Sequence, residues 1–139
     1  MHKMIILLLT CFLSCAAVAQ AGSVIIIANK DISATSLRPE EIQRIFLSKK
    51  TTWDDGKRIT AVCQKSGPAH AAFLRSFLDM NPSQYDIFWK HAVFTGTGRP
   101  LKSLADEADV VEFVRTTPGG IGYINSETPH DDVKTMKVQ

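Results

Sequence analysis

Four short apolar runs in this chain have the length and composition of β-strands, and polar or glycine-containing segments separate them. The run 24–28 consists of β-branched residues followed by Ala28, which is typical of a strand buried on both faces. The sequence Trp53-Asp54-Asp55-Gly56 predicts a turn before the second run. The other runs that predict strands are Ile59–Cys63, Ile121–Ile124 and Val133–Val138.

Four segments with apolar residues at helical spacing lie between these runs, and proline marks the start of three of them. Proline is tolerated in the first helical turn because its missing N–H would have had no partner there. The predicted helices begin at Pro39, near Ser66-Gly67-Pro68, at Asn81-Pro82 and near Ser103, where Asp106 would complete a capping box. The first should end near Lys49, a loop should follow from Phe94 to Pro100, and Pro118-Gly119-Gly120 should end the last helix. Strands that alternate with helices predict an α/β domain with a largely parallel sheet flanked by helices.

The first 21 residues have the plan of a secretory signal peptide. Lys3 precedes a nearly continuous apolar run, and Ala19-Gln20-Ala21 supplies small residues spaced for signal peptidase. We expect cleavage there, after Ala21 or Ala19, and a periplasmic location for the mature domain, residues 22–139. A lipoprotein with Cys15 lipidated is the minor alternative, because Leu13 is large for a lipobox.

Composition narrows the classes of protein that the remaining 118 residues can form. Their length suits one compact domain. Cys11 and Cys15 leave with the predicted signal, so Cys63 alone cannot form an internal disulfide framework. Basic and acidic residues nearly balance and form no basic stripe, so we expect no nucleic-acid partner.

The order of several short motifs resembles the periplasmic substrate-binding proteins of phosphate ABC transporters. The motifs are Ile45-Phe46-Leu47, Thr52-Trp53-Asp54-Asp55-Gly56, Ser66-Gly67, Phe94-Thr95-Gly96 and Pro118-Gly119-Gly120-Ile121-Gly122-Tyr123-Ile124. Proteins of that family have two lobes and more than twice this length, so the resemblance implies a single lobe of a type II periplasmic-binding-protein fold. It also implies a solute-binding protein without enzymatic activity or cofactor, with a phosphate-like oxyanion as ligand and an ABC transporter as partner.

The segment Gln64-Lys65-Ser66-Gly67 is the candidate anion site. A Ser-Gly pair between a strand and a helix offers free backbone N–H groups and the positive end of the helix dipole, and Lys65 adds charge. The resemblance implies the same function, because an arginine followed by a Ser-Gly-Thr helix start holds phosphate in that family. Here Pro68 replaces the threonine and no arginine precedes the serine. We therefore expect modest affinity unless dimerisation or a partner covers the site, and an ordinary capped helix remains an equal interpretation.

The other reactive residues have simpler explanations. Ser66 with His70 invites a hydrolase hypothesis, but no Gly-x-Ser-x-Gly elbow surrounds the serine, and His70 is expected to be partly exposed on its helix. Cys63, on an apolar strand, is expected to be a core side chain, and the spacing of the histidines disfavours zinc. Arg99 and Lys102 either border the anion site or are solvated loop charges. The alternative to a binding protein is a periplasmic interaction module that kept the lobe but lost the ligand, and apolar surface left exposed on it would bind a partner.

Overall fold

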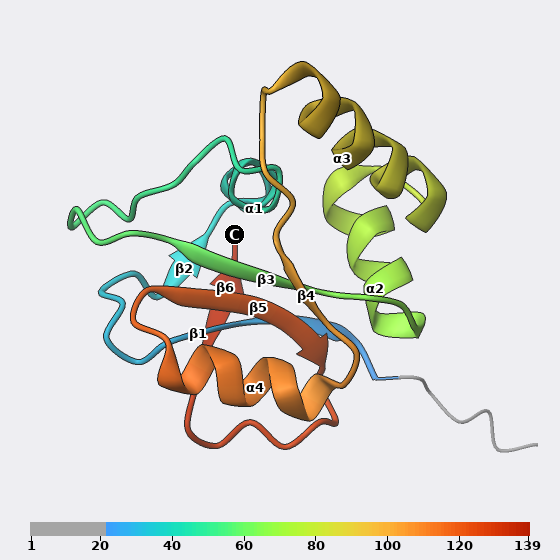
Figure 1. The fold of residues 1–139 in the computed structure, drawn as a ribbon. Helices are drawn as coiled ribbons and strands as arrows, with labels where there is room; N and C mark the ends of the chain where they lie inside the picture. Colours follow the sequence, from blue (N-terminus) through green and yellow to red (C-terminus); the bar gives the residue numbers. More distant parts are fainter. Residues whose placement is uncertain (1–21) are drawn as a thin grey trace, which may run out of the picture.

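The computed structural model describes residues 22–139, and within them six strands form one sheet in the order β2-β6-β1-β5-β3-β4 (Figure 1). Three pairings, β2 with β6, β3 with β5 and β3 with β4, are parallel, so the predicted α/β fold with a mostly parallel sheet is confirmed. Strand β1 is the exception, because it runs antiparallel to both of its neighbours, β5 and β6. The strands are β1 (Val24–Ala28), β2 (Ser36–Leu37), β3 (Thr60–Gln64), β4 (Lys102–Leu104), β5 (Gly120–Asn125) and β6 (Lys134–Val138).

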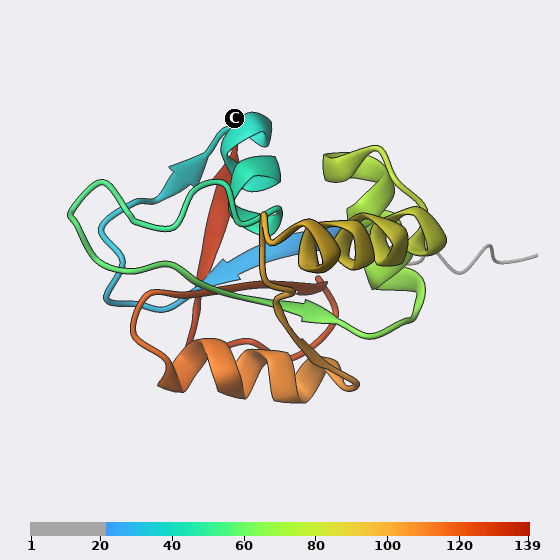
Figure 2. The same ribbon diagram turned by 45° about the horizontal axis from the view of Figure 1, so that its top comes forward.

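Helices cover both faces of the sheet, as Figure 2 shows. Helix α4 lies against one face, where Val110 and Val114 pack with Ile27, Val62 and Ile124. The other helices lie on the opposite face and enclose a larger core. The helices are α1 (Pro39–Phe46), α2 (Pro68–Phe73), the π-helix η1 (Leu74–Leu78), α3 (Pro82–Thr95) and α4 (Glu107–Thr116).

Aromatic rings form the centre of the larger core. Tyr123 of β5 stacks on Phe73 of α2, with ring centroids 3.8 Å apart and an interplanar angle of 2°. Phe46 of α1 meets both rings edge-on. Aromatic pairs of this kind stabilise a core beyond the area they bury, so α1 and α2 are fixed against the same strand.

Several predicted boundaries differ from the structure, and tertiary contacts explain the differences. Helix α1 ends at Phe46 rather than near Lys49. Ser103 does not cap α4, because it pairs with Cys63 in the parallel β3–β4 ladder, and Asp106 is the N-cap residue. Phe94 belongs to α3, which ends where Gly96 adopts the left-handed conformation.

The start of α2 also differs from the prediction. Its N-cap residue is Gly67, and Ser66 makes no capping hydrogen bond. Gly67 has φ +104°, a backbone region that residues with a Cβ rarely adopt, so glycine is needed for the chain to turn from β3 into the helix. After Phe73 the helix continues as η1 without a break, so residues 68–78 form one helical stretch.

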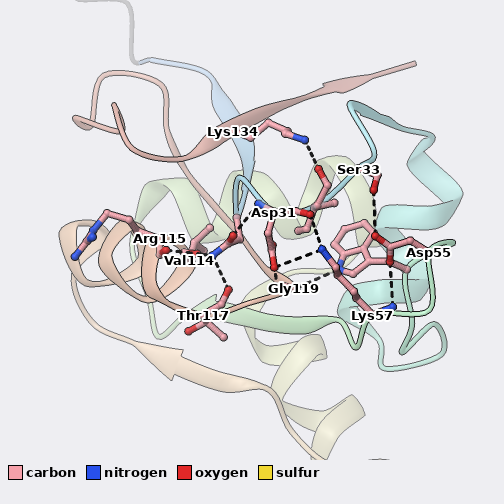
Figure 3. Close-up of polar contacts among 12 residues, drawn as sticks. Asp31, Ser33, Asp55, Lys57, Val114, Arg115, Thr117, Gly119 and Lys134 are labelled. Carbon is pink, nitrogen blue, oxygen red and sulfur yellow. Dashed lines mark hydrogen bonds and ion pairs between the residues drawn. The ribbon is translucent and has the colours of Figure 1, made fainter.

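A polar network at the start of β3 and β5 joins the Trp-Asp-Asp-Gly and Pro-Gly-Gly motifs (Figure 3). The Trp53 indole donates to the Gly119 carbonyl oxygen over 3.1 Å, and the Thr60 N–H donates to the same oxygen over 3.0 Å. The Asn29 amide donates to the carbonyl oxygens of Val114, Arg115 and Thr117 at the end of α4. These donors and acceptors are hydrogen-bonded to one another, so the network has a structural role and fixes the N-terminal ends of β3 and β5.

Candidate functional site

The candidate site lies at the opposite end of β3, where the strand ends and the chain turns into α2. Lys65, Ser66 and Gly67 are exposed there. The Lys65 N–H donates to the Leu104 carbonyl oxygen over 3.0 Å, which ties the turn to β4. These three of the four predicted residues therefore lie together on one exposed turn, between the end of β3 and the start of α2.

Free backbone donors gather at this turn. In residues 22–139, the N–H groups of Ser66, Gly67, Ala69 and His70 donate to no protein acceptor. The first N–H groups of a helix have no partner within the helix, and together they carry the positive end of its dipole. An anion placed here would accept bonds from groups that otherwise depend on water, and Lys65 would add a positive charge beside it.

Gln64 contributes to this turn in a different way from its neighbours. Its side chain is buried, and the amide nitrogen donates to the Tyr123 carbonyl oxygen over 2.8 Å and to Glu107 Oε1 over 3.2 Å. Its backbone N–H donates to the Tyr123 hydroxyl over 3.0 Å. The two hydrogens of the side-chain amide and the backbone N–H of Gln64 all have partners within the protein, so Gln64 positions the turn and offers no free donor to a ligand.

Glu107 is a neighbour of the turn that sequence reasoning missed. Its carboxylate accepts bonds from the Gln64 amide, the Asn125 N–H and the Thr128 hydroxyl. A shallow hollow next to it is lined by Pro68, Asn125 and a second acidic residue, Glu127. Negative charge on this side opposes an anion, so only the Lys65 side of the turn favours one.

His70 is buried, with 3% of its surface exposed, so the prediction of a partly exposed residue is wrong. Its Nδ1 atom lies 2.5 Å from the Tyr123 hydroxyl oxygen, and Ser66 makes no contact of this kind with the ring. The serine and the histidine therefore do not form a nucleophile and base pair. Burial is the main cause of the lowered pKa of His70, and the nearby Asp86 charge opposes it.

The hydrogen bonds around Tyr123 determine which ring nitrogen of His70 carries the proton. The Tyr123 hydroxyl accepts the Gln64 N–H, and its own hydrogen has His70 Nδ1 as its acceptor. With the proton on Nδ1 instead, the buried hydroxyl hydrogen would have no acceptor among residues 22–139, at a cost of about 1–3 kcal/mol. His70 is thus a neutral ring with its proton on Nε2.

Other side chains that the sequence singled out lie away from the turn or inside the core. Cys63 is buried, and burial raises its pKa to about 11, so the thiol is a core group as expected. Tyr85 and Trp89 are also buried. The Lys102 ammonium lies 5.2 Å from the centre of the Phe113 ring on α4, and Arg99 is exposed. In residues 22–139 no cluster of three or more His, Cys, Asp or Glu side chains has the arrangement of a metal site.

Comparisons with known proteins identify the class of fold. No family model and no curated protein matches the sequence. Solved structures match it well: an ABC-type phosphate transport receptor from Vibrio cholerae has a TM-score of 0.66 at 16% identity. PstS from Borrelia burgdorferi has a TM-score of 0.65 at 17% identity. A putative phosphate ABC transporter substrate-binding protein from Clostridium perfringens, with bound phosphate, has 0.59 at 19% identity. The chain therefore has a periplasmic-binding-protein fold.

The match covers most of this chain but only part of its neighbours. It spans 84–85% of the chain, and 46%, 47% and 45% of the Vibrio, Borrelia and Clostridium proteins. The chain thus spans about half the length of the solved structures that it resembles. At this level of identity the structural similarity defines the fold, and any statement about the ligand has to rest on the residues of this chain.

The predicted signal peptide falls on residues 1–21, outside the described part. No helix among residues 22–139 has the length and apolar character needed to cross a membrane.

Proposed function

We propose that this chain is an exported, periplasmic binding protein without enzymatic activity, which takes a small phosphate-like oxyanion at the turn after β3. The observation that carries the proposal is the set of free N–H groups at Ser66 and Gly67, beside the charge of Lys65. Gln64 holds this turn in place through its bonds to Tyr123. The neighbours of the same fold include a protein solved with bound phosphate, which supports this class of ligand. An ABC transporter is the corresponding partner.

The affinity expected at this site is modest. Ser66, Gly67 and Lys65 are exposed, so water screens every charge-assisted bond that the anion makes. Pro68 removes one N–H from the first turn, and the Glu107 carboxylate lies behind Gln64. A second protein or a second copy that covers the turn would exclude water and strengthen binding.

Thermal unfolding with phosphate, against chloride of equal ionic strength, tests the proposal. At ten times the Kd, phosphate should stabilise the protein by about 1.4 kcal/mol and raise the Tm by roughly 4–8 °C. The double variant Lys65→Ala/Ser66→Ala should lose this shift. The matched control Lys49→Ala/Ser76→Ala, with exposed residues away from the turn, should keep it. Equal shifts in both variants would place the anion elsewhere, and no shift at millimolar phosphate would refute a solitary phosphate receptor.

An interaction module that kept the lobe and lost the ligand is the second candidate. Exposed apolar side chains on α3 favour it: Ile87, Val93 and Phe94 are 64%, 55% and 91% exposed. Large apolar side chains that gather on one helix are typical of a surface that a partner covers. This candidate predicts no phosphate effect on the Tm, together with self-association that sedimentation velocity detects and that Phe94→Ser weakens.

A further inference from the structure

A cleft of about 630 Å³ opens beside the turn, between α3, the end of β3 and the segment that leads into β4. Figure 2 shows α3 above the carboxyl end of β3, with this segment descending next to it. The volume falls in the range of small-molecule sites, roughly 300–1,000 Å³. Ser66 and Gly67 do not line the cleft, whereas Gln64 and Lys65 do, so the cleft adjoins the proposed anion turn and shares Lys65 with it.

The body of the cleft is apolar. Val93, Phe94 and Leu101 line it, together with the aromatic rings of Tyr85 and Trp89. Phe94 is 91% exposed although it is a large apolar side chain on a well-formed helix. An apolar lining with a few polar groups is the usual composition of a site for an organic ligand.

The polar groups of the cleft are mostly hydrogen-bond donors. Trp89 is 7% exposed, and its indole nitrogen is covered next to the Tyr85 hydroxyl, without a hydrogen bond of good geometry among residues 22–139. The Trp89 ring, rather than its N–H group, therefore forms part of the cleft wall. His70 carries its ring proton on Nε2, because Nδ1 is bonded to Tyr123, and His70 also lines the cleft. The imidazole therefore contributes a donor at the wall of the cleft.

The charges that line the cleft favour an anionic group. Lys65 and Lys90 are exposed and line it, and Asp86 is the single carboxylate among its lining residues. Two ammonium groups against one carboxylate leave a net positive charge. We infer that this cleft binds a small organic acid, with its carboxylate among the imidazole and lysine donors and its apolar body against Phe94 and Leu101. This ligand goes beyond the proposed oxyanion, which has no apolar body.

The indole N–H signal of Trp89 reports such binding, because the Trp89 ring lines the cleft. The protein has two tryptophans, and Trp53 is bonded to Gly119 at the far edge of the sheet, so it serves as an internal control. The two ¹H–¹⁵N indole signals are assigned with a Trp89→Phe variant. Titration with phenylacetate should shift the Trp89 signal saturably and leave the Trp53 signal in place.

Two reference compounds separate the parts of the proposed ligand. 2-Phenylethanol keeps the apolar body without the charge, and we expect it to bind at least about fivefold more weakly than phenylacetate. Phosphate keeps the charge without the body and should not shift Trp89, whatever it does at the Ser66 turn. Equal affinity for phenylacetate and 2-phenylethanol, equal shifts of both indoles, or no Trp89 shift with phenylacetate would each overturn the inference.

Variants then test the walls of the cleft. Lys90→Gln should weaken phenylacetate binding by roughly 3- to 10-fold, whereas the exposed Lys49→Gln outside the cleft should not change it. Ser103→Phe should fill part of the cleft and weaken binding further. Unchanged affinity in both Lys90→Gln and Ser103→Phe would refute the site. Lys65 belongs to both sites, but the phosphate effect on the Tm and the Trp89 shift with phenylacetate are separate measurements, so the two proposals can fail independently.

Discussion

At the scale of single residues, His70 couples the stability of the fold to pH. The folded protein holds a neutral ring, with its pKa lowered chiefly by burial, whereas in the unfolded chain the ring takes a proton near pH 6.5. As the pH falls through that value, protons bind the unfolded state first, and the free energy of unfolding decreases. We expect chemical denaturation to show lower stability at pH 5.5 than at pH 7.5.

A non-titrating variant identifies the residue responsible. In His70→Asn, the side-chain oxygen can still accept the Tyr123 hydroxyl hydrogen, but the pH dependence over this range should decrease. His91→Asn, at an exposed position on α3, should keep the dependence of the natural protein. Carboxylates titrate near pH 4 and contribute little in this window. An unchanged slope in His70→Asn would assign the effect to another group.

The sequence predicted the turn at the candidate site, but not the contacts of the buried residues around it. Lys65, Ser66 and Gly67 follow a β-branched strand and precede a proline, and that local pattern is enough to predict a turn into a helix. The burial of His70 depends on Tyr123, which is 53 residues away along the chain. Such a contact leaves no mark in the local sequence, and the same holds for the bond between Gln64 and Glu107.

At the scale of elements, α3 depends on the cap at its first turn. The Asn81 side chain accepts the Gln84 N–H, and the Gln84 side chain accepts the Asn81 N–H, each over 2.8 Å. Asn81→Ala removes one half of this capping box and should lower the free energy of unfolding by about 1 kcal/mol. The Tm should fall by roughly 3–5 °C in calorimetry.

The neighbouring serine provides the control for this cap. Ser83 is exposed in the same first turn and takes no part in the capping box, so Ser83→Ala should leave the Tm within about 1–2 °C. A loss in Ser83→Ala as large as that in Asn81→Ala would show that the turn, rather than the cap, sets the stability.

The start of α3 at Asn81-Pro82 could be predicted from the sequence. The π-helix η1 and the pairing of Ser103 with Cys63 in the β3–β4 ladder could not, because both depend on packing against other elements.

At the scale of the whole molecule, the proposed export predicts a shortened chain. Cell fractionation should find the protein in the periplasm, and intact-mass analysis should show a chain that begins at Gly22 or at Gln20. A lipid-modified chain that begins at Cys15 would indicate the lipoprotein alternative. Full-length protein in the cytoplasm would contradict export.

Periodicity predicted the α/β class but not the direction of every strand. Residues 24–28 have the composition of a buried strand, and that composition does not depend on the direction of the neighbouring strands. The antiparallel pairing of β1 with β5 and β6 could therefore not be predicted from this segment. The motifs around Trp53 and Gly119 are two of those that carried the resemblance, and the structure brings those two residues together.

The place of β1 in the sheet determines when the chain can finish folding. This strand is synthesised first among the strands, yet its partners are the last two, with Ile26 opposite Tyr123 and Met136. Contacts between residues so far apart in sequence form slowly, and these require the C-terminal segment to be present. A ribosome-bound or half-translocated chain cannot complete its central ladder. If the chain is exported as proposed, this topology delays closure of the sheet until the end of the chain has emerged.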